Sequence, residues 1–376
     1  MNKLWISILV LAALVWTSAG CAPAEQGQEQ VPSAPAEQEQ EQAPSAPAEK
    51  VYTFTWQDNS GPGVTMLLTL EDMAARIKAD SGGAIDIKVV PEGTIVPRAE
   101  SSPAVKDGVL DIATNDTSMD LGRLGPIVYL TGPAGVPAGP STLDIVGWVY
   151  KGGGMDLVAD IYKDYGYVVG VQPGAPELFA HSNKPLSTKA DFKGLKFRTA
   201  GMWSELLTSY GAAVVMINAG ELYSSVERGV LDAFELGPPS FNWPYGFHEV
   251  CDYIGLPGIH SPGYAKPVLF NKAAWDSLPP TLQELFKSEV LGMCMDTYMA
   301  LKVTDAEALA NYAAYGTKTF YVDDAFQAEI AADSRALIAK LAQEDPAFAA
   351  LWEQEQAFYK VWRGADTLVP KYTIFD

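Results

Sequence analysis

Three observations predict an α/β protein of two lobes that face each other across a hinged cleft. Residues 51–376 form a longer globular stretch than one hydrophobic core usually serves. The same arrangement of a helix, a glycine and a strand occurs twice, around the tetrapeptide GVLD at 108–111 and at 229–232. Residues 280–315 keep apolar side chains at helical spacing. A helix of that length would be about 50 Å long, so we expect it to bridge both lobes.

The first fifty residues are expected to form a leader and a tether outside both lobes. Lys3 precedes an apolar run that is too short to cross a bilayer core of ~30 Å, and small residues follow it up to Cys21. This pattern is typical of a lipoprotein signal peptide at 1–20, with Cys21 lipidated as the membrane anchor. A plain secretory leader is the alternative. Residues 21–50 are rich in Pro, Glu and Gln and predict a disordered tether, or else an acidic segment that binds a partner.

Strands and helices alternate in both halves of the globular part. In each half a glycine is expected to end a helix, a Val-Leu pair to enter the core, and polar residues to follow the next strand. Ligands of open α/β sheets bind at such strand ends. The pattern predicts strands at 51–56, 84–90, 112–114, 196–197, 213–217 and 233–236, and helices at 69–79, 103–106, 203–210 and 221–228.

Composition limits the classes of function. The formal charge of −20 argues against a nucleic-acid partner and requires a few well-placed cations to attract an anionic ligand. Cys251 and Cys294 could pair in an oxidising compartment or remain two buried thiols. The histidines His181, His248 and His260 lack metal-ligand spacing, so we expect packing roles, with His260 the one to watch. No phosphate loop, nucleophile elbow or histidine metal motif indicates an enzyme.

A resemblance to a known family is carried by residues 191–243, which read DFKGLKFRTAGMWSELLTSYGAAVVMINAGELYSSVERGVLDAFELGPPSFNW. This segment resembles the substrate-binding proteins of TRAP (tripartite ATP-independent periplasmic) transporters, the DctP-like family. The resemblance extends from Val51 to Asp376, and includes PVLFNKAAWDSLPP at 267–280. It looks closest to the branch that binds 2-oxo or 2-hydroxy monocarboxylates, often with a metal ion beside the ligand.

The resemblance implies a periplasmic binding protein fold. Lobe I would comprise 51–172 and about 262–285, and lobe II 173–261 and about 300–376. It also implies a receptor on the periplasmic or cell-surface side that captures a small organic acid by closure of its lobes. The receptor would deliver the acid to the small and large membrane subunits without catalysis, and part of the branch forms homodimers.

Two other readings of function remain open. A binding protein of an ABC importer or of a sensor kinase, for a carboxylate or an amino acid, would share the fold and the hinged capture. An enzyme could use Glu177 and Glu235 as an acid and base pair. The bridging helix favours the TRAP reading.

The family's signature arginine corresponds to Arg198 in KGLKFR. It would form a bidentate salt bridge with the ligand's carboxylate, because the rigid guanidinium fork matches that group. Asn115 or its neighbours would contact the ligand from lobe I. The side chains expected to line the pocket are Trp56, Asn115, Trp203, Phe241, Asn242 and Trp243.

The resemblance also implies a metal site. Glu235 follows the second GVLD at the place of a metal-binding Glu, and Leu236 would offer a backbone carbonyl where the branch commonly has Trp. Glu177 stands near a branch Gln, with Gln172 as the fallback, and Ser261 stands near a later metal-binding Glu of the branch. Two carboxylates and carbonyls can hold Na⁺ or Ca²⁺, but the same carboxylates could receive an amino group or hydroxyls instead.

Overall fold

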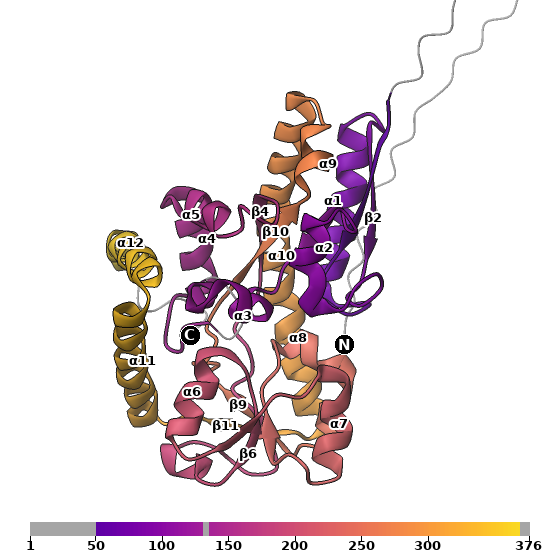
Figure 1. Cartoon of the computed structure of the whole chain (residues 1–376). Helices are drawn as coiled ribbons and strands as arrows, with labels where there is room; N and C mark the ends of the chain where they lie inside the picture. The colour runs from indigo at the N-terminus through magenta and orange to yellow at the C-terminus, as the bar shows by residue number, and fades with distance from the viewer. Residues whose placement is uncertain (1–49, 131–134, 369–376) are drawn as a thin grey trace, which may run out of the picture. The chain divides into compact units, whose positions relative to one another are not determined.

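The computed structural model describes residues 50–130 and 135–368, which fold into two α/β lobes joined by a long helix (Figure 1). The predicted signal peptide, the lipidation site Cys21 and the tether up to residue 49 lie outside the described residues. Within the described ranges no helix is long and apolar enough to cross a membrane.

Lobe I is built on a five-stranded sheet in the order β2-β1-β3-β10-β4. β1 runs parallel to β2 and β3, whereas β10 runs antiparallel to β3 and β4. The strands are β1 (Tyr52–Gln57), β2 (Ile85–Val90), β3 (Ile112–Thr114), β4 (Tyr167–Pro173) and β10 (Ala265–Phe270). The helices are α1 (Thr65–Asp80), α2 (Ser101–Lys106), α3 (Leu121–Leu124), α4 (Thr142–Lys151), α5 (Gly154–Ile161) and α9 (Lys272–Asp276).

Lobe II is built on a six-stranded sheet in the order β11-β9-β5-β8-β6-β7. β6 runs parallel to β7 and β8, and β5 runs antiparallel to β8 and β9. The strands are β5 (His181–Ser182), β6 (Lys196–Arg198), β7 (Ala213–Val215), β8 (Ala233–Phe234), β9 (Tyr253–Leu256) and β11 (Lys318–Tyr321). The helices are α6 (Gly201–Ser209), α7 (Ala219–Glu227) and α8 (Pro239–Asn242).

The repeated tetrapeptide adopts the same conformation in both lobes. Gly108 has φ +71° and Gly229 has φ +69°, a left-handed conformation that suits glycine after a helix. Leu110 and Leu231 are buried, but the valine of each tetrapeptide is 58% and 51% exposed. The expected Val-Leu pair is thus corrected to a leucine alone, because the valine stays at the surface in both lobes.

The aspartate of each tetrapeptide makes an equivalent bond to the neighbouring strand. The backbone N–H of Thr55 in β1 donates to Asp111 Oδ2 at 2.8 Å. The N–H of Lys196 in β6 donates to Asp232 Oδ2, also at 2.8 Å. The shared bond supports one architecture used twice. In each lobe it ties the turn before one strand to the strand beside it.

The bridging helix α10 (Pro280–Tyr315) has the expected bounds. Proline occupies its first position, where no N–H bond is lost, and Gly316 in a left-handed conformation ends it. Phe286, Val290 and Met293 pack in the core of lobe I, while Tyr312 packs in lobe II. The helix therefore contributes to both cores.

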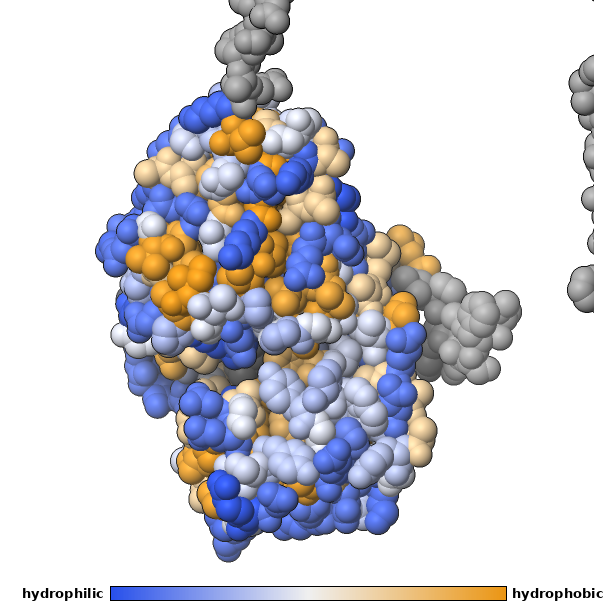
Figure 2. Space-filling model, turned by 90° about the vertical axis from the view of Figure 1, so that its right-hand side faces the viewer, coloured by the Kyte–Doolittle hydropathy of each residue, from blue (hydrophilic) through white to orange (hydrophobic). Residues whose placement is uncertain are grey.

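One row of α10 is left uncovered. It consists of four apolar side chains spaced four residues apart, which places them on one side of the helix: Leu291, Met295, Met299 and Val303. Figure 2 shows orange side chains gathered over the upper part of the face in view, and a mostly hydrophilic lower part.

The C-terminal helices differ from the expected division of the chain. α11 (Asp324–Glu344) packs Phe326 and Ile330 in lobe II but Ile338 and Leu341 in lobe I. α12 (Pro346–Trp362) packs on lobe I, through Phe348, Leu351 and Tyr359. The assignment of about 300–376 to lobe II is therefore corrected. Helical periodicity identifies an apolar face but not the lobe that covers it.

The two cysteines of the globular part remain free, buried thiols. Cys294 on α10 packs in the core of lobe I, and Cys251 packs in lobe II. Burial raises the pKa of both thiols to about 12. Of the two alternatives left open by the sequence, the structure supports unpaired thiols.

Candidate functional site

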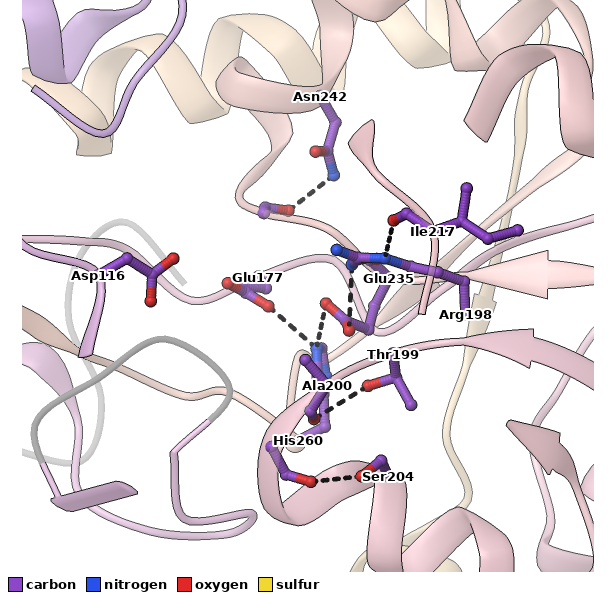
Figure 3. Close-up of polar contacts among 12 residues, drawn as sticks. Asp116, Glu177, Arg198, Thr199, Ala200, Ser204, Ile217, Glu235, Asn242 and His260 are labelled. Atoms are coloured by element: carbon purple, nitrogen blue, oxygen red, sulfur yellow. Dashed lines mark hydrogen bonds and ion pairs between the residues drawn. The ribbon is translucent and has the colours of Figure 1, made fainter. Parts of the chain in front are cut away.

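Two adjacent strand ends in lobe II bring Arg198 and Glu235 together. Arg198 ends β6 and pairs in register with Phe234 of β8, so Glu235 follows directly beside it. Arg198 Nη1 donates to the backbone carbonyl of Glu235 at 2.6 Å and lies 3.5 Å from its Oε1 (Figure 3). Arg198 Nε donates to the carbonyl of Ile217 at 3.1 Å. Two fixed acceptors thus hold the plane of the guanidinium before any ligand arrives.

Glu177 reaches the same place from the segment that crosses between the lobes after β4. Its backbone N–H donates to the carbonyl of Ser261 at 3.1 Å. This bond joins the segment that leaves lobe I after β4 to the segment that returns to lobe I before β10. A Cβ at Gly258 would lie 1.8 Å from the carbonyl oxygen of Glu177, so only glycine permits this close approach. The local backbone therefore fixes the position of Glu177.

Glu177, Glu235 and His260 form a buried cluster. His260 Nε2 lies 3.3 Å from Glu177 Oε2 and 3.9 Å from Glu235 Oε2, and none of the three residues is more than 2% exposed (Figure 3). Burial, and then the neighbouring carboxylate of Glu235, raise the pKa of Glu177 well above its usual value, although Arg198 opposes this. Burial lowers the pKa of His260 to about 4, which leaves the imidazole neutral near pH 7.

The donor atoms of this cluster fit a cation. One atom from each of the three side chains lies within 4.8 Å of the others. Two buried carboxylates that face each other repel unless a proton or a cation lies between them. Carboxylate oxygens suit Na⁺ and Ca²⁺, and a neutral imidazole can add a nitrogen ligand.

The cluster borders a small cavity between the lobes. Its volume is about 40 Å³, well below the ~300–1,000 Å³ of typical ligand sites. The lobes must therefore separate to admit a ligand. The lining residues are Asn59, Met66, Arg98, Asp116, Glu177, Leu236, Gly237, Pro238, Phe241, Tyr264 and Lys266.

Of the residues predicted for the site, Glu177, Leu236 and Phe241 line the cavity. Ser261 is buried beside Glu177, and its hydroxyl has no partner among the described residues. Arg198 and Glu235 are not among the lining residues. Arg198 contacts Glu235, which shares His260 with the lining residue Glu177.

Three other predicted residues are used elsewhere, which corrects the expected lining. Trp56 is part of the core of lobe I, stacks on Phe286 and donates from Nε1 to Thr114. Trp203 packs among the aromatic side chains of lobe II, although its ring is 5.9 Å from that of His260. The Asn115 amide donates to Asp120 at 2.6 Å and Tyr162 at 3.1 Å. These side chains are committed to packing and internal bonds.

The remaining predicted residues support the walls. Asn242 Nδ2 donates to the carbonyl of Gly237 at 2.7 Å, which shapes a turn that lines the cavity. Trp243 stacks on His248 away from it. The Gln172 amide donates to the carbonyl of Met66 at 3.0 Å.

Sequence reasoning missed four polar residues of the lobe I wall. Asn59, Arg98 and Lys266 were not singled out, and Asp116 belongs to the polar residues expected after a strand. A signal for Lys266 exists, because it is the one charged residue in the otherwise apolar strand β10. No comparable pattern marks Arg98, which precedes a short helix.

The family of the chain follows from comparison with known sequences. The model of the family described as DctP, bacterial extracellular solute-binding protein, family 7, matches residues 58–345. The chain belongs to this family. The resemblance noted in residues 191–243 is thereby confirmed, and the family is one of solute-binding receptors rather than enzymes.

Curated relatives are recognisable over different lengths. The chain is 27% identical over 313 residues to the monocarboxylate 2-oxoacid-binding periplasmic protein of Nostoc sp., covering 82% of this chain and 83% of that protein. It is 33% identical over 110 residues to the 2,3-diketo-L-gulonate-binding periplasmic protein YiaO of Escherichia coli, covering 29% and 33%.

Solved structures confirm the two-lobed fold. A TRAP solute-binding protein of Bordetella bronchiseptica, a dimer with calcium and picolinate in one site, has TM-score 0.76 at 21% identity, covering 85% of this chain and 95% of that one. One of Colwellia psychrerythraea, with calcium and pyruvate, has TM-score 0.75 at 24% identity, covering 84% and 97%. An apo open structure from Rhodobacter sphaeroides has TM-score 0.65 at 27% identity, covering 82% and 98%.

Proposed function

We propose that the protein is the extracytoplasmic receptor of a TRAP transporter and captures a 2-oxo or 2-hydroxy monocarboxylate without transforming it. The observation that carries the proposal is the guanidinium of Arg198, which two backbone carbonyls fix beside a buried carboxylate pair. Its Nη2 makes no hydrogen bond within residues 50–130 and 135–368. That nitrogen and the second N–H of Nη1 can receive a carboxylate.

The cation site would complete ligand recognition. Glu177 and Glu235 would hold Na⁺ or Ca²⁺ through their oxygens, with His260, the Leu236 carbonyl and the Ser261 hydroxyl as further donors. An ion bound there would neutralise the facing carboxylates and offer the ligand a second positive contact. The calcium or sodium bound in several TRAP solute-binding proteins of known structure supports this expectation.

Closure of the lobes would signal to the membrane subunits that the ligand is bound. The ligand would touch Arg198 in lobe II and the Arg98, Asp116 and Lys266 wall in lobe I. It would then have higher affinity for the closed state. The TRAP membrane subunits would recognise that state, and lipidated Cys21 would keep the receptor at the membrane. A homodimer of the kind named for the Bordetella structure is a further expectation.

A thermal-shift screen of the purified protein tests the proposal. Pyruvate, lactate, malonate and an amino acid would each be added with Ca²⁺ and with a chelator. Ligand binding raises the stability by RT ln(1 + [L]/Kd), so micromolar binding is visible at millimolar ligand. We expect stabilisation by the monocarboxylates that requires the ion. The absence of a shift with every organic acid would contradict the proposal, and turnover of a bound acid would contradict the non-enzymatic role.

A further inference from the structure

The lobe I wall of the cavity contains a buried lysine that has no partner among the described residues. Lys266 in β10 is 3% exposed and lines the cavity. Among the described residues its ammonium makes no hydrogen bond and no ion pair within 4.0 Å, although burying a charge without such partners is costly. Burial lowers the pKa of Lys266, and Asp58 partly offsets this. A group of this kind at a cavity wall has donors available for a ligand.

The neighbouring arginine, by contrast, is already occupied. Arg98 Nε lies 3.1 Å from Glu92, its Nη1 lies 3.7 Å from Asp116, and its Nη2 donates to the backbone carbonyl of Asn59. One of these contacts, from Nη2, is a hydrogen bond, and the other two pair the guanidinium electrostatically with Glu92 and Asp116. Lys266 is therefore the cation of this wall that has no ion pair within the described part of the chain.

The same wall has further polar atoms without partners. Both the Oδ1 and the Nδ2 of Asn59 are buried and make no hydrogen bond to the described residues, and Asn59 also lines the cavity. A ligand that satisfied Asn59 as well as Lys266 would have to accept and donate hydrogen bonds at one end. A hydroxyl group does both, whereas a carboxylate only accepts.

The charges of the wall also argue against a second carboxylate on the ligand. Two cations, Arg98 and Lys266, face three carboxylates, those of Asp58, Glu92 and Asp116. A further negative charge would add to an existing excess in a buried site. A neutral oxygen group can accept from the ammonium without that repulsion.

We propose that Lys266 and Asn59 bind a hydroxyl group at the end of the ligand that points away from Arg198. The ligand is accordingly a hydroxylated carboxylic acid rather than a simple alkyl acid or a dicarboxylate. This inference rests on the proposed function, because it takes the carboxylate of the ligand to be bound by Arg198. Lys266 is then a residue that determines specificity from the opposite lobe.

Two matched ligand series test the inference by calorimetric titration in the presence of Ca²⁺. Lactate, glycerate and tartronate differ only at the third carbon, which is a methyl, a hydroxymethyl or a carboxylate. The acids 2-hydroxybutyrate, 2,4-dihydroxybutyrate and malate repeat this comparison one carbon longer. We expect the hydroxymethyl acid of at least one series to bind about tenfold or more tightly than both its companions, since a site built for a hydroxyl rejects analogues that lack it.

The variant Lys266→Met removes the ammonium and keeps the length of the side chain. It should lower affinity for the preferred acid about tenfold and leave that for its methyl companion within about twofold. The variant without ligand should melt at a higher temperature than the wild type, because an unpaired buried charge is gone. Lys88→Met, at an exposed site on β2 of the same lobe, should change neither property.

Equal affinity for the methyl and hydroxymethyl acids in both series would overturn the inference. So would tightest binding of tartronate or malate with dependence on Lys266, which would make this an anion site. The wild-type series decides the question even if Lys266→Met does not fold. If no acid of either series binds, and none binds in the wider screen, the proposed function itself fails.

Discussion

Arg198 donates to the backbone carbonyl of Glu235 at 2.6 Å and lies 3.5 Å from the carboxylate of the same residue. The backbone carbonyl of Glu235 thus orients the Arg198 guanidinium, which is expected to bind the acid. The side chain of Glu235 is expected to bind the metal ion. Because β6 and β8 pair in register, the relationship is fixed by the sheet rather than by flexible loops. On the proposed function, acid binding and ion binding would therefore depend on each other.

Replacement of Arg198 by Lys should reduce acid affinity at least about a hundredfold while leaving the fold intact. Lysine keeps the charge but not the planar fork that holds two carbonyls and a carboxylate together. Calorimetric titration with pyruvate and lactate measures the effect, and circular dichroism monitors the fold. Arg228→Lys, at an exposed residue after α7, is the matched control. Unchanged affinity in Arg198→Lys would show that the carboxylate is bound elsewhere.

Glu235→Gln should abolish the dependence of ligand binding on Ca²⁺. The amide keeps the size of the side chain but removes one of two facing carboxylates, so a cation loses a charged oxygen ligand. Thermal shifts with calcium and with a chelator, at fixed ligand concentration, provide the measurement. Glu221→Gln, on the exposed side of α7, should retain the wild-type response. A calcium response preserved in Glu235→Gln would remove Glu235 from the ion site.

His181 should make the protein less stable as the pH falls below about 6.5. It is fully buried, and burial lowers its pKa from 6.5 to about 3 in the folded state. Between these values the unfolded chain binds a proton that the folded chain does not, so the free energy of unfolding falls by about 1.4 kcal/mol per pH unit. This contribution is fully present above pH 6.5.

Urea unfolding of His181→Gln at a series of pH values tests this prediction. Glutamine does not titrate, and its amide can face Asn242, which now lies 3.2 Å from His181 Nε2. The free energy of unfolding should therefore depend less steeply on pH between 6.5 and 4 than in the wild type, whatever its absolute value. Identical slopes in the two proteins would exclude His181 as the titrating group.

Gly258→Ala should weaken ion and acid binding and lower the melting temperature. The added Cβ would lie 1.8 Å from the carbonyl oxygen of Glu177, so the crossing segments must move apart. Gly292→Ala on α10 is the control, and it should raise the melting temperature instead of lowering it. Apart from the backbone of the helix itself, no atom lies within 4 Å of the added Cβ there, and alanine favours a helix by about 1 kcal/mol. A Gly258→Ala protein as stable and as active in binding as the wild type would contradict the close approach.

Local signals in the sequence predicted much of the fold. The repeated GVLD, the periodic residues of 280–315 and the signature arginine each correspond to one element or one turn of the structure. The folding of α11 and α12 back onto lobe I was not predictable in this way. Their apolar faces indicate burial but not a partner, and the choice is made by contacts such as Ile338 with the core of lobe I.

The site was less predictable than the fold for a similar reason. Trp56 and Trp203 were expected at the pocket because aromatic residues often line one, yet both fill cores behind it. The roles of Glu177 and His260 depend on two crossing segments that are far apart in the sequence. Lys266 lies in an apolar strand. The pattern of that strand predicts burial, but it does not indicate the cavity beside it.

A crystal structure of the protein with calcium and a bound 2-hydroxy or 2-oxo acid is the most direct test of the central claim. We predict that the carboxylate of the ligand lies within hydrogen-bonding distance of both Nη atoms of Arg198, with the ion contacting Glu177 and Glu235. A carboxylate bound instead by Arg98 and Lys266, with Arg198 left to its two carbonyls, would contradict the account.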